Sequence, residues 1–128
     1  AFAPRQSLPS LPGILHLTYV QNTGAAFSLF QGQVAALIVI SVVVAGWMAW
    51  ELIRRPQPTR SITIALGLIL GGAIGNLIDR VRWGYVIDFI DVRVWPVFNV
   101  ADSAITIGVC WLIWQALIHA DQHADRRR

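Results

Sequence analysis

Polar side chains gather between two apolar runs of this 128-residue sequence. They are Asn76, Asp79, Arg80, Asp88, Asp91, Asn99, Asp102 and Ser103. When two carboxyl groups are held close together, the repulsion between like charges separates their pKa values, so that one is ionised while the other keeps its proton. Such a pair can hydrolyse a peptide bond, because the base takes a proton from a water between them while the acid protonates the carbonyl oxygen or the leaving nitrogen.

Asp88 is the aspartate that is hardest to explain as structural. Apolar residues flank it and no cation is adjacent, so its carboxyl group is either buried with a raised pKa or paired with a residue distant in sequence. Asp79 stands beside Arg80, and an ion pair explains it at least as well as a chemical role. Spacing favours Asp88 with Asp102, but it leaves open Asp91 in place of Asp88 and a contribution from Asp79.

Asp102 also has a structural explanation. Asn99 is a favourable N-cap residue, and Asp102 follows three residues later, in the first turn of the predicted helix. The positive end of the helix dipole would favour the ionised carboxylate at that position. The sequence therefore predicts a capping arrangement between Asn99 and Asp102, whether or not Asp102 takes part in chemistry.

Other hydrolytic mechanisms are excluded or disfavoured by residue type. All ten basic residues are arginine, so a Ser–Lys dyad is impossible, and no His-Glu-x-x-His zinc motif occurs. His119 and His123 follow the last apolar run, away from the acidic residues. His16 lies in a β-like stretch and is expected to be a surface residue rather than a catalyst.

Composition indicates that lipid is the solvent of this chain. Hydrophobic residues make up 55% of the sequence and charged residues only 13%, whereas a soluble domain carries about 25% charged residues. The net charge of +3 comes from arginines scattered between apolar runs, which is typical of helix ends at lipid headgroups rather than of nucleic-acid binding. The single cysteine, Cys110, lies inside an apolar run and forms no intramolecular disulfide.

Three apolar segments are predicted to span a membrane, at residues 34–53, 62–78 and 104–118. A span of 20 residues rises about 30 Å, which is one hydrocarbon core. The loop 54–60 and the tail 126–128 lie on one side of the predicted bundle and hold six of the ten arginines. The positive-inside tendency therefore places them in the cytoplasm and the acidic residues outside.

The two outward segments, 13–33 and 81–98, contain β-like sequence. Residues 14–20 are rich in β-formers and lead to a turn signal, and residues 86–95 form a second stretch that Pro96 stops. These stretches predict a small sheet on the outer membrane surface, and residues 25–30 are compatible with a short interfacial helix. The chain is thus a mainly α membrane protein, with 1–128 as a single domain.

Glycines recur along the middle span. Gly67, Gly71 and Gly75 are spaced by four residues, so they share one helix face. A stripe of small residues allows the backbone of a neighbouring helix to approach closely. We therefore expect this stripe to be the packing face of the span, which would also bring its polar end close to the neighbouring helices.

Four stretches of the chain resemble, in order, the signature blocks of lipoprotein signal peptidase, also called signal peptidase II. They are YVQNTGAAFS at 19–28, GGAIGNLIDR at 71–80, VIDFID at 86–91 and FNVADSAI at 98–105. The resemblance extends from about residue 11 to about residue 118. Each block alone is a weak signal, but four in the family's order form a specific one.

The resemblance implies an aspartic peptidase of the bacterial cytoplasmic membrane that cuts a signal peptide before a cysteine carrying a diacylglyceryl group. By motif match, Asp88 and Asp102 are the catalytic pair. The positions that match residues orienting the substrate or the aspartates are Asn22, Asn76, Arg80 and Asn99, and those that match small residues near the site are Gly75 and Ala101. The family needs no metal or organic cofactor.

The resemblance also implies an architecture and partners. The family has four spans, a β-cradle on the outer membrane surface and a short periplasmic helix, whereas this chain shows three spans, so the first of the four is expected to be missing. The implied partners are a diacylglyceryl-modified prolipoprotein, membrane lipid and globomycin-type cyclic peptide inhibitors. Nucleic acid is not among them, and the protein is expected to be a monomer.

Two alternatives remain from the residues alone. A small transporter or proton-relay subunit would also contain intramembrane carboxylates and a glycine-packed span, but its acids would be distributed through the bilayer rather than gathered at one face. A purely structural membrane subunit leaves Asp88 and its polar neighbours without a purpose. Both alternatives predict that Asp88→Asn and Asp102→Asn leave the cleavage of a lipoprotein precursor unchanged.

Overall fold

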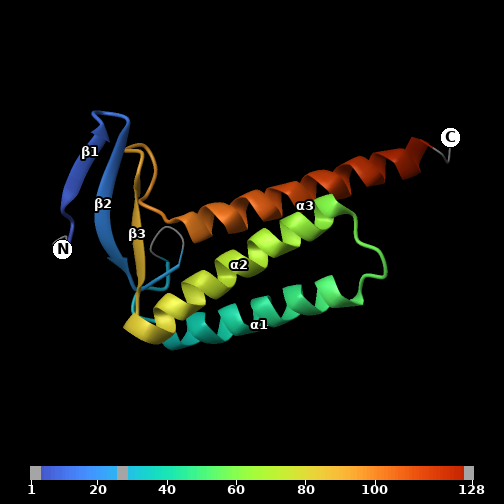
Figure 1. Cartoon of the computed structure of the whole chain (residues 1–128), viewed down its shortest axis with the longest axis horizontal. Helices are drawn as coiled ribbons and strands as arrows, with labels where there is room; N and C mark the ends of the chain where they lie inside the picture. The colour runs from blue at the N-terminus through green and yellow to red at the C-terminus, as the bar shows by residue number, and fades with distance from the viewer. Residues whose placement is uncertain (1–3, 26–28, 126–128) are drawn as a thin grey trace.

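Three long helices lie alongside one another, and a small sheet crosses one end of them (Figure 1). A computed structural model describes residues 4–25 and 29–125. The elements follow the order β1 (Ser7–Leu11), β2 (Leu15–Asn22), α1 (Val34–Arg54), α2 (Arg60–Trp83), β3 (Val86–Asp91) and α3 (Val100–Asp125). In Figure 1 the strands run across the helix axes, so the sheet would lie along a membrane surface that the helices cross.

Each helix is long and apolar enough to cross a membrane. Most large apolar side chains on α1 and α3 are exposed in the isolated chain, and the buried core consists of Met48, Leu66 and Ile69 with their neighbours. In a bilayer these exposed side chains face lipid tails, so no larger protein core is needed. The fold is mainly helical with a small sheet, as the sequence predicts, and α2 and α3 extend beyond the predicted spans at both ends.

The sheet is antiparallel, with the strand order β1-β2-β3. Two of its strands overlap the two stretches that β-propensity indicates, although β2 continues to Asn22, beyond the predicted residue 20, and β3 ends at Asp91, earlier than the predicted residue 95. The first strand was not predicted; it contains Pro9, and proline is tolerated on an edge strand, which β1 is. The short helix expected at 25–30 includes residues 26–28, which lie outside the described residues.

The close contact between α2 and α3 does not follow the predicted glycine stripe. Gly67 and Gly71 face open space, and a Cβ on Gly75 would meet only the Cβ of Ala101, at 3.7 Å. The tight approach is at Gly72, where a Cβ would stand 2.5 Å from the carbonyl oxygen of Ala101, and at Gly108 on α3. On a helix, residues three apart are neighbours on one face just as residues four apart are, so a regular spacing of four does not by itself identify the packing face. The buried face therefore passes through Gly72 rather than along the stripe.

The end of α2 directs the chain into the sheet. Gly84 caps the helix with a left-handed φ of 75°, and its N–H donates to the carbonyl oxygen of Arg80. Glycine adopts this conformation at little cost, so the chain can turn within two residues. β3 begins at Val86, and Asp88 therefore lies close to the polar end of the helix that precedes it.

Candidate active site

Asp88 lies in the middle of β3 and is only 2% exposed. Two amides hold its carboxylate. The Nδ2 atom of Asn22 donates to Oδ2 at 2.9 Å, and the Nδ2 atom of Asn99 donates to Oδ1 at 3.0 Å. Asn22 ends β2 and Asn99 precedes α3, so three separate elements converge on one buried acid.

Burial raises the pKa of Asp88 to about 6. The hydrogen bonds from Asn22 and Asn99 lower it, and the nearby charge of Asp102 raises it further. Within the described residues, no arginine forms an ion pair with this carboxyl group. Of the two alternatives that the sequence leaves open for Asp88, burial with a raised pKa is the one found, and the group can hold a proton at a pH where an ordinary aspartate cannot.

Asp102 is part of a capping box at the start of α3. The backbone N–H of Asp102 donates to Oδ1 of Asn99 at 3.0 Å, and the backbone N–H of Asn99 donates to Oδ2 of Asp102 at 3.2 Å. The predicted capping arrangement is thus confirmed. The other carboxylate oxygen, Oδ1, accepts a hydrogen bond from Nδ2 of Asn76 at 3.0 Å, which ties α3 to α2.

Asn99 joins the two acids into one network. Its Nδ2 atom donates both to Asp88 and, at 3.1 Å, to Oδ1 of Asn76, which in turn donates to Asp102. Asn76 and Asn99 are both buried. The two carboxyl groups, 14 positions apart in sequence, are therefore linked by two buried amides, and neither acid can shift without disturbing the other.

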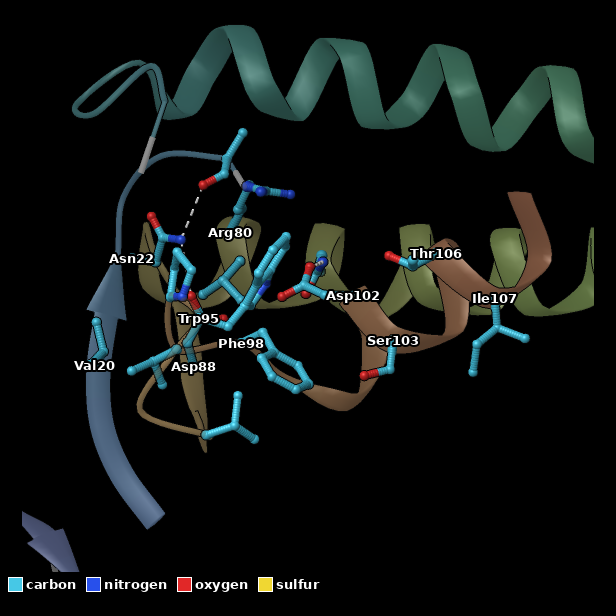
Figure 2. A pocket seen from close by; sticks show the side chains of 16 residues that line it. Val20, Asn22, Arg80, Asp88, Trp95, Phe98, Asp102, Ser103, Thr106 and Ile107 are labelled. Atoms are coloured by element: carbon cyan, nitrogen blue, oxygen red, sulfur yellow. Dashed lines mark hydrogen bonds between the residues drawn. The ribbon is translucent and has the colours of Figure 1, made fainter. Parts of the chain in front are cut away.

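Both acids line a cavity of about 610 Å³ at the sheet end of the helices (Figure 2). Its polar lining consists of Asn22, Asn76, Arg80, Asp88, Asp102, Ser103 and Thr106, and its apolar lining includes Val20, Val92, Trp95, Pro96, Val97, Phe98 and Ile107. The segment 92–98, between β3 and α3, supplies most of the apolar side. The sequence did not predict that this segment lines the site, because its residues follow no periodic pattern that would show which of its side chains face the acids.

Arg80 contributes a positive charge to the cavity lining. Its Nη2 atom donates to the carbonyl oxygen of Gly24 at 3.3 Å, and its Nη1 atom donates to Oγ of Ser41 at 3.5 Å. In the described part of the chain its buried Nε atom has no hydrogen-bond partner. Arg80 therefore connects α2 with α1 and with the chain that follows β2, while its charge remains near both acids.

The structure brings together the residues that the motifs single out and separates two others. Asp79 lies outside the cavity lining, and Asp91 accepts hydrogen bonds from Thr18 and from the backbone of Arg93. The expectation of a surface-exposed His16 is wrong, because its side chain is buried against the sheet and contacts Arg93. Among the described residues, no three His, Cys, Asp or Glu side chains are grouped so that they could hold a metal ion.

Fold and site together define a helical membrane protein with two linked carboxyl groups in a cavity at one end of its spans. Residues 2–118 match a family model described as signal peptidase (SPase) II. The chain belongs to the signal peptidase II family.

Similar proteins and structures agree with this assignment. The chain is 46% identical over 121 residues to the lipoprotein signal peptidase of Moorella thermoacetica. This alignment covers 94% of this chain and 81% of that protein. It is 51% identical over 106 residues to the lipoprotein signal peptidase of Caldanaerobacter subterraneus, and this alignment covers 82% of this chain and 72% of that protein. A solved bacterial membrane enzyme superposes with a TM-score of 0.90 at 32% identity, covering 94% of this chain and 76% of the other.

Proposed function

We propose that this protein is an aspartic endopeptidase of the bacterial inner membrane that removes signal peptides from lipoprotein precursors, cutting before the lipidated cysteine. The observation that carries the proposal is the network in which Asn99 and Asn76 connect the buried carboxyl group of Asp88 with that of Asp102, in one cavity. Membership of the signal peptidase II family supports the substrate.

In the proposed reaction Asp102 is the base and Asp88 the acid. A water between them attacks the carbonyl carbon of the scissile peptide and passes a proton to the Asp102 carboxylate, while Asp88 gives its proton to the carbonyl oxygen. The tetrahedral intermediate then collapses. The C–N bond breaks, the proton on Asp102 goes to the leaving nitrogen of the cysteine, and the hydroxyl proton of the intermediate returns to Asp88.

The burial of Asp88, which raises its pKa to about 6, supports this division of roles. A carboxyl group that holds its proton longer is suited to be the acid. Asp102, at the N-terminus of α3, accepts hydrogen bonds from Asn76 and from the backbone N–H of Asn99, and these hold its carboxyl group in place to take a proton from the water.

The remaining polar lining would orient the substrate. Asn22, Asn76 and Asn99 hold the acids through hydrogen bonds, and Arg80 offers the nearby cation to a substrate carbonyl or the lipid ester. Gly75 and Ala101 keep the adjoining faces of α2 and α3 small. We propose that 1–128 acts as one peptidase domain, as a monomer, and that globomycin-type cyclic peptides bind in the cavity.

The proposed substrate matches the position of the cavity. A diacylglyceryl-modified cysteine keeps its acyl chains in the outer leaflet, so its peptide bond lies near the headgroups. The cavity is at the sheet end of the helices, and the arginine-rich loop 54–60 lies at the other (Figure 1). With that loop in the cytoplasm by the positive-inside tendency, the acids would meet the substrate at the outer face.

The proposal is tested by cleavage of a synthetic diacylglyceryl-modified prolipopeptide by the protein in phospholipid vesicles. Asp88→Asn and Asp102→Asn should each lower kcat by about 10³-fold or more, since each removes one partner of the acid–base pair. Asp79→Asn, outside the cavity lining, is the matched control and should leave kcat within about twofold. If both cavity variants cleave as the parent does, a transport or structural role replaces the peptidase.

A further inference from the structure

A second polar cluster lies at the end of the sheet opposite to Asn22. It consists of Ser7, His16, Thr18, Asp91 and Arg93. His16 pairs with Asp91 across β2 and β3, whereas Val20, nearer the end of β2, pairs with Asp88. The cluster is therefore separate from the acid pair, although one strand carries both.

Arg93 is the centre of this cluster. Its Nη2 atom lies 2.6 Å from Nδ1 of His16, and its Nη1 atom lies 3.7 Å from Oδ2 of Asp91. Its backbone N–H donates to Oδ1 of Asp91 at 2.9 Å. One side chain thus ties the segment after β3 to the neighbouring strand β2.

The backbone at Arg93 is strained. Its φ is +66°, a conformation that residues other than glycine rarely adopt, and the N–H of Val94 donates across it to the carbonyl oxygen of Val92 at 2.8 Å. Strained turns persist where surrounding contacts fix them. The contacts of Arg93 with His16, with Asp91 and with Oγ of Ser7, at 3.5 Å from Nη2, can do this.

The strained turn shapes the cavity. Val92, immediately before Arg93, and Trp95, Pro96, Val97 and Phe98 after it all line the cavity that holds the acids. Phe98 is fixed to β3 by its bridge with Ile90. Between these points the turn at Arg93 directs the chain, so a change at Arg93 would alter the apolar side of the cavity.

We infer that Arg93 is a positioning residue, which holds the wall 92–97 against β2 through its contact with His16 and thereby sets the affinity for the peptide part of the substrate. This inference rests on the proposed peptidase function. Arg93 itself does not line the cavity, so it acts through Val92 and Trp95 rather than by touching the substrate.

The contact with His16 needs an acceptor on the imidazole. A guanidinium only donates hydrogen bonds, so Nδ1 of His16 is the acceptor that faces Nη2 of Arg93. The backbone N–H of Gly13 lies 3.4 Å from Nε2, the other ring nitrogen. A side chain at position 16 without an acceptor would leave the turn without its support from β2.

The test measures kcat and KM for cleavage of a synthetic diacylglyceryl-modified prolipopeptide by the protein in phospholipid vesicles. Arg93→Ala should raise KM about tenfold, the effect of losing a charge-assisted hydrogen bond, with kcat nearly unchanged. His16→Gln, which keeps a side-chain acceptor for Arg93, should leave KM within about twofold of the parent value, whereas His16→Leu, which removes the acceptor, should raise KM as Arg93→Ala does.

The matched control is Arg82→Ala, which removes another arginine from the same end of the molecule, one that stacks on Trp83 rather than joining the cluster. It should leave KM unchanged. An Arg93→Ala variant that loses kcat at constant KM overturns the inference, and so does a His16→Leu variant that keeps the parent KM.

Hydrogen exchange separates this inference from the proposed function. The amide of Val94, bonded within the turn, should exchange faster in Arg93→Ala than in the parent, with the amides of α2 unchanged as a check of folding. If the parent cleaves no lipopeptide, the proposed function fails while exchange still tests the contact. If exchange at Val94 is unchanged in Arg93→Ala, the inference fails even where cleavage is found.

Discussion

The carboxyl group of Asp88 is held by neutral amides rather than by a cation. An amide donates a hydrogen bond without a full charge, so it fixes the position of the carboxylate and stabilises the ionised form less than an arginine would. Asn99 does this for Asp88 with its Nδ2 atom, which also donates to Asn76, while its Oδ1 atom caps α3. One asparagine thus sets the position of both acids and still leaves Asp88 able to hold a proton.

This arrangement predicts how kcat responds to pH. If Asp88 is the acid, kcat falls as the pH rises through the pKa of about 6 at which the pair loses that proton. In Asn22→Ala one of the bonds that lower the pKa of Asp88 is gone. The loss of a hydrogen bond to a charged group shifts a pKa by about one unit. The alkaline limb of the kcat profile should therefore move about one pH unit upward.

The control for this shift is Gln21→Ala. Gln21 is the neighbouring residue, its side chain is exposed and donates to the hydroxyl of Tyr19, so its variant should keep the parent profile. A limb that moves downward in Asn22→Ala, or that moves equally in the control, would contradict the assignment of Asp88 as the proton donor.

At the scale of the elements, structural features that depend on neighbouring residues in the sequence could be predicted, and features that depend on tertiary contacts could not. The apolar runs predict the helices, and the spacing of Asn99 and Asp102 predicts the cap, because each depends on a few neighbouring residues. The prediction of the packing face of α2 was wrong. Several faces of a glycine-rich helix carry small residues, and the contact with α3 determines which of them is buried. The strand containing Pro9 depends on its pairing with β2, and the burial of His16, which lies on β2, depends on β1 and Arg93 beside it.

The same distinction applies to the site. The motif match could name Asp88 and Asp102, and the structure brings both to one cavity. The course of the wall 92–97 could not be predicted, because it follows from the turn at Arg93 and from the bridge between Ile90 and Phe98. Both contacts involve residues whose types carry no chemical signature.

The packing of α2 on α3 gives a prediction with a close internal control. A Cβ at Gly72 would stand 2.5 Å from the carbonyl oxygen of Ala101, one residue before Asp102. Gly72→Ala should therefore push the helices apart, stretch the bond between Asn76 and Asp102, and destabilise the fold by about 1–3 kcal/mol, as overpacking does. Gly71→Ala faces open space and should be neutral or slightly stabilising, because alanine favours helix.

Thermal unfolding in detergent and the kcat for lipopeptide cleavage measure this pair of variants. Gly72→Ala should lower both the unfolding temperature and kcat, whereas Gly71→Ala should lower neither. Equal losses in the two variants would mean that the contact face of α2 is the regular stripe of Gly67 and Gly71 after all.

The whole molecule separates a lipid-facing part from a part at the membrane surface. The helices expose apolar side chains along most of their length, and the sheet crosses one end of them (Figure 1). The cavity lies where the two parts meet, with the acids at the sheet side and Thr106 and Ile107 further along α3. A substrate with an acyl chain and an extended peptide could therefore enter with each part in its preferred solvent.

This arrangement, with the charge distribution, predicts the orientation of the protein in its membrane. Cys110 is the single cysteine, so a Cys110→Ala background allows single new cysteines to be labelled. Ile14→Cys, at an exposed position beside the sheet, should react with a membrane-impermeant maleimide applied to intact spheroplasts. Gln57→Cys, exposed in the loop between α1 and α2, should react only after permeabilisation, because the arginines around it favour the cytoplasm. Labelling of Gln57→Cys but not of Ile14→Cys in intact spheroplasts would place the acid pair at the cytoplasmic face, where it could not meet a lipid anchored in the outer leaflet.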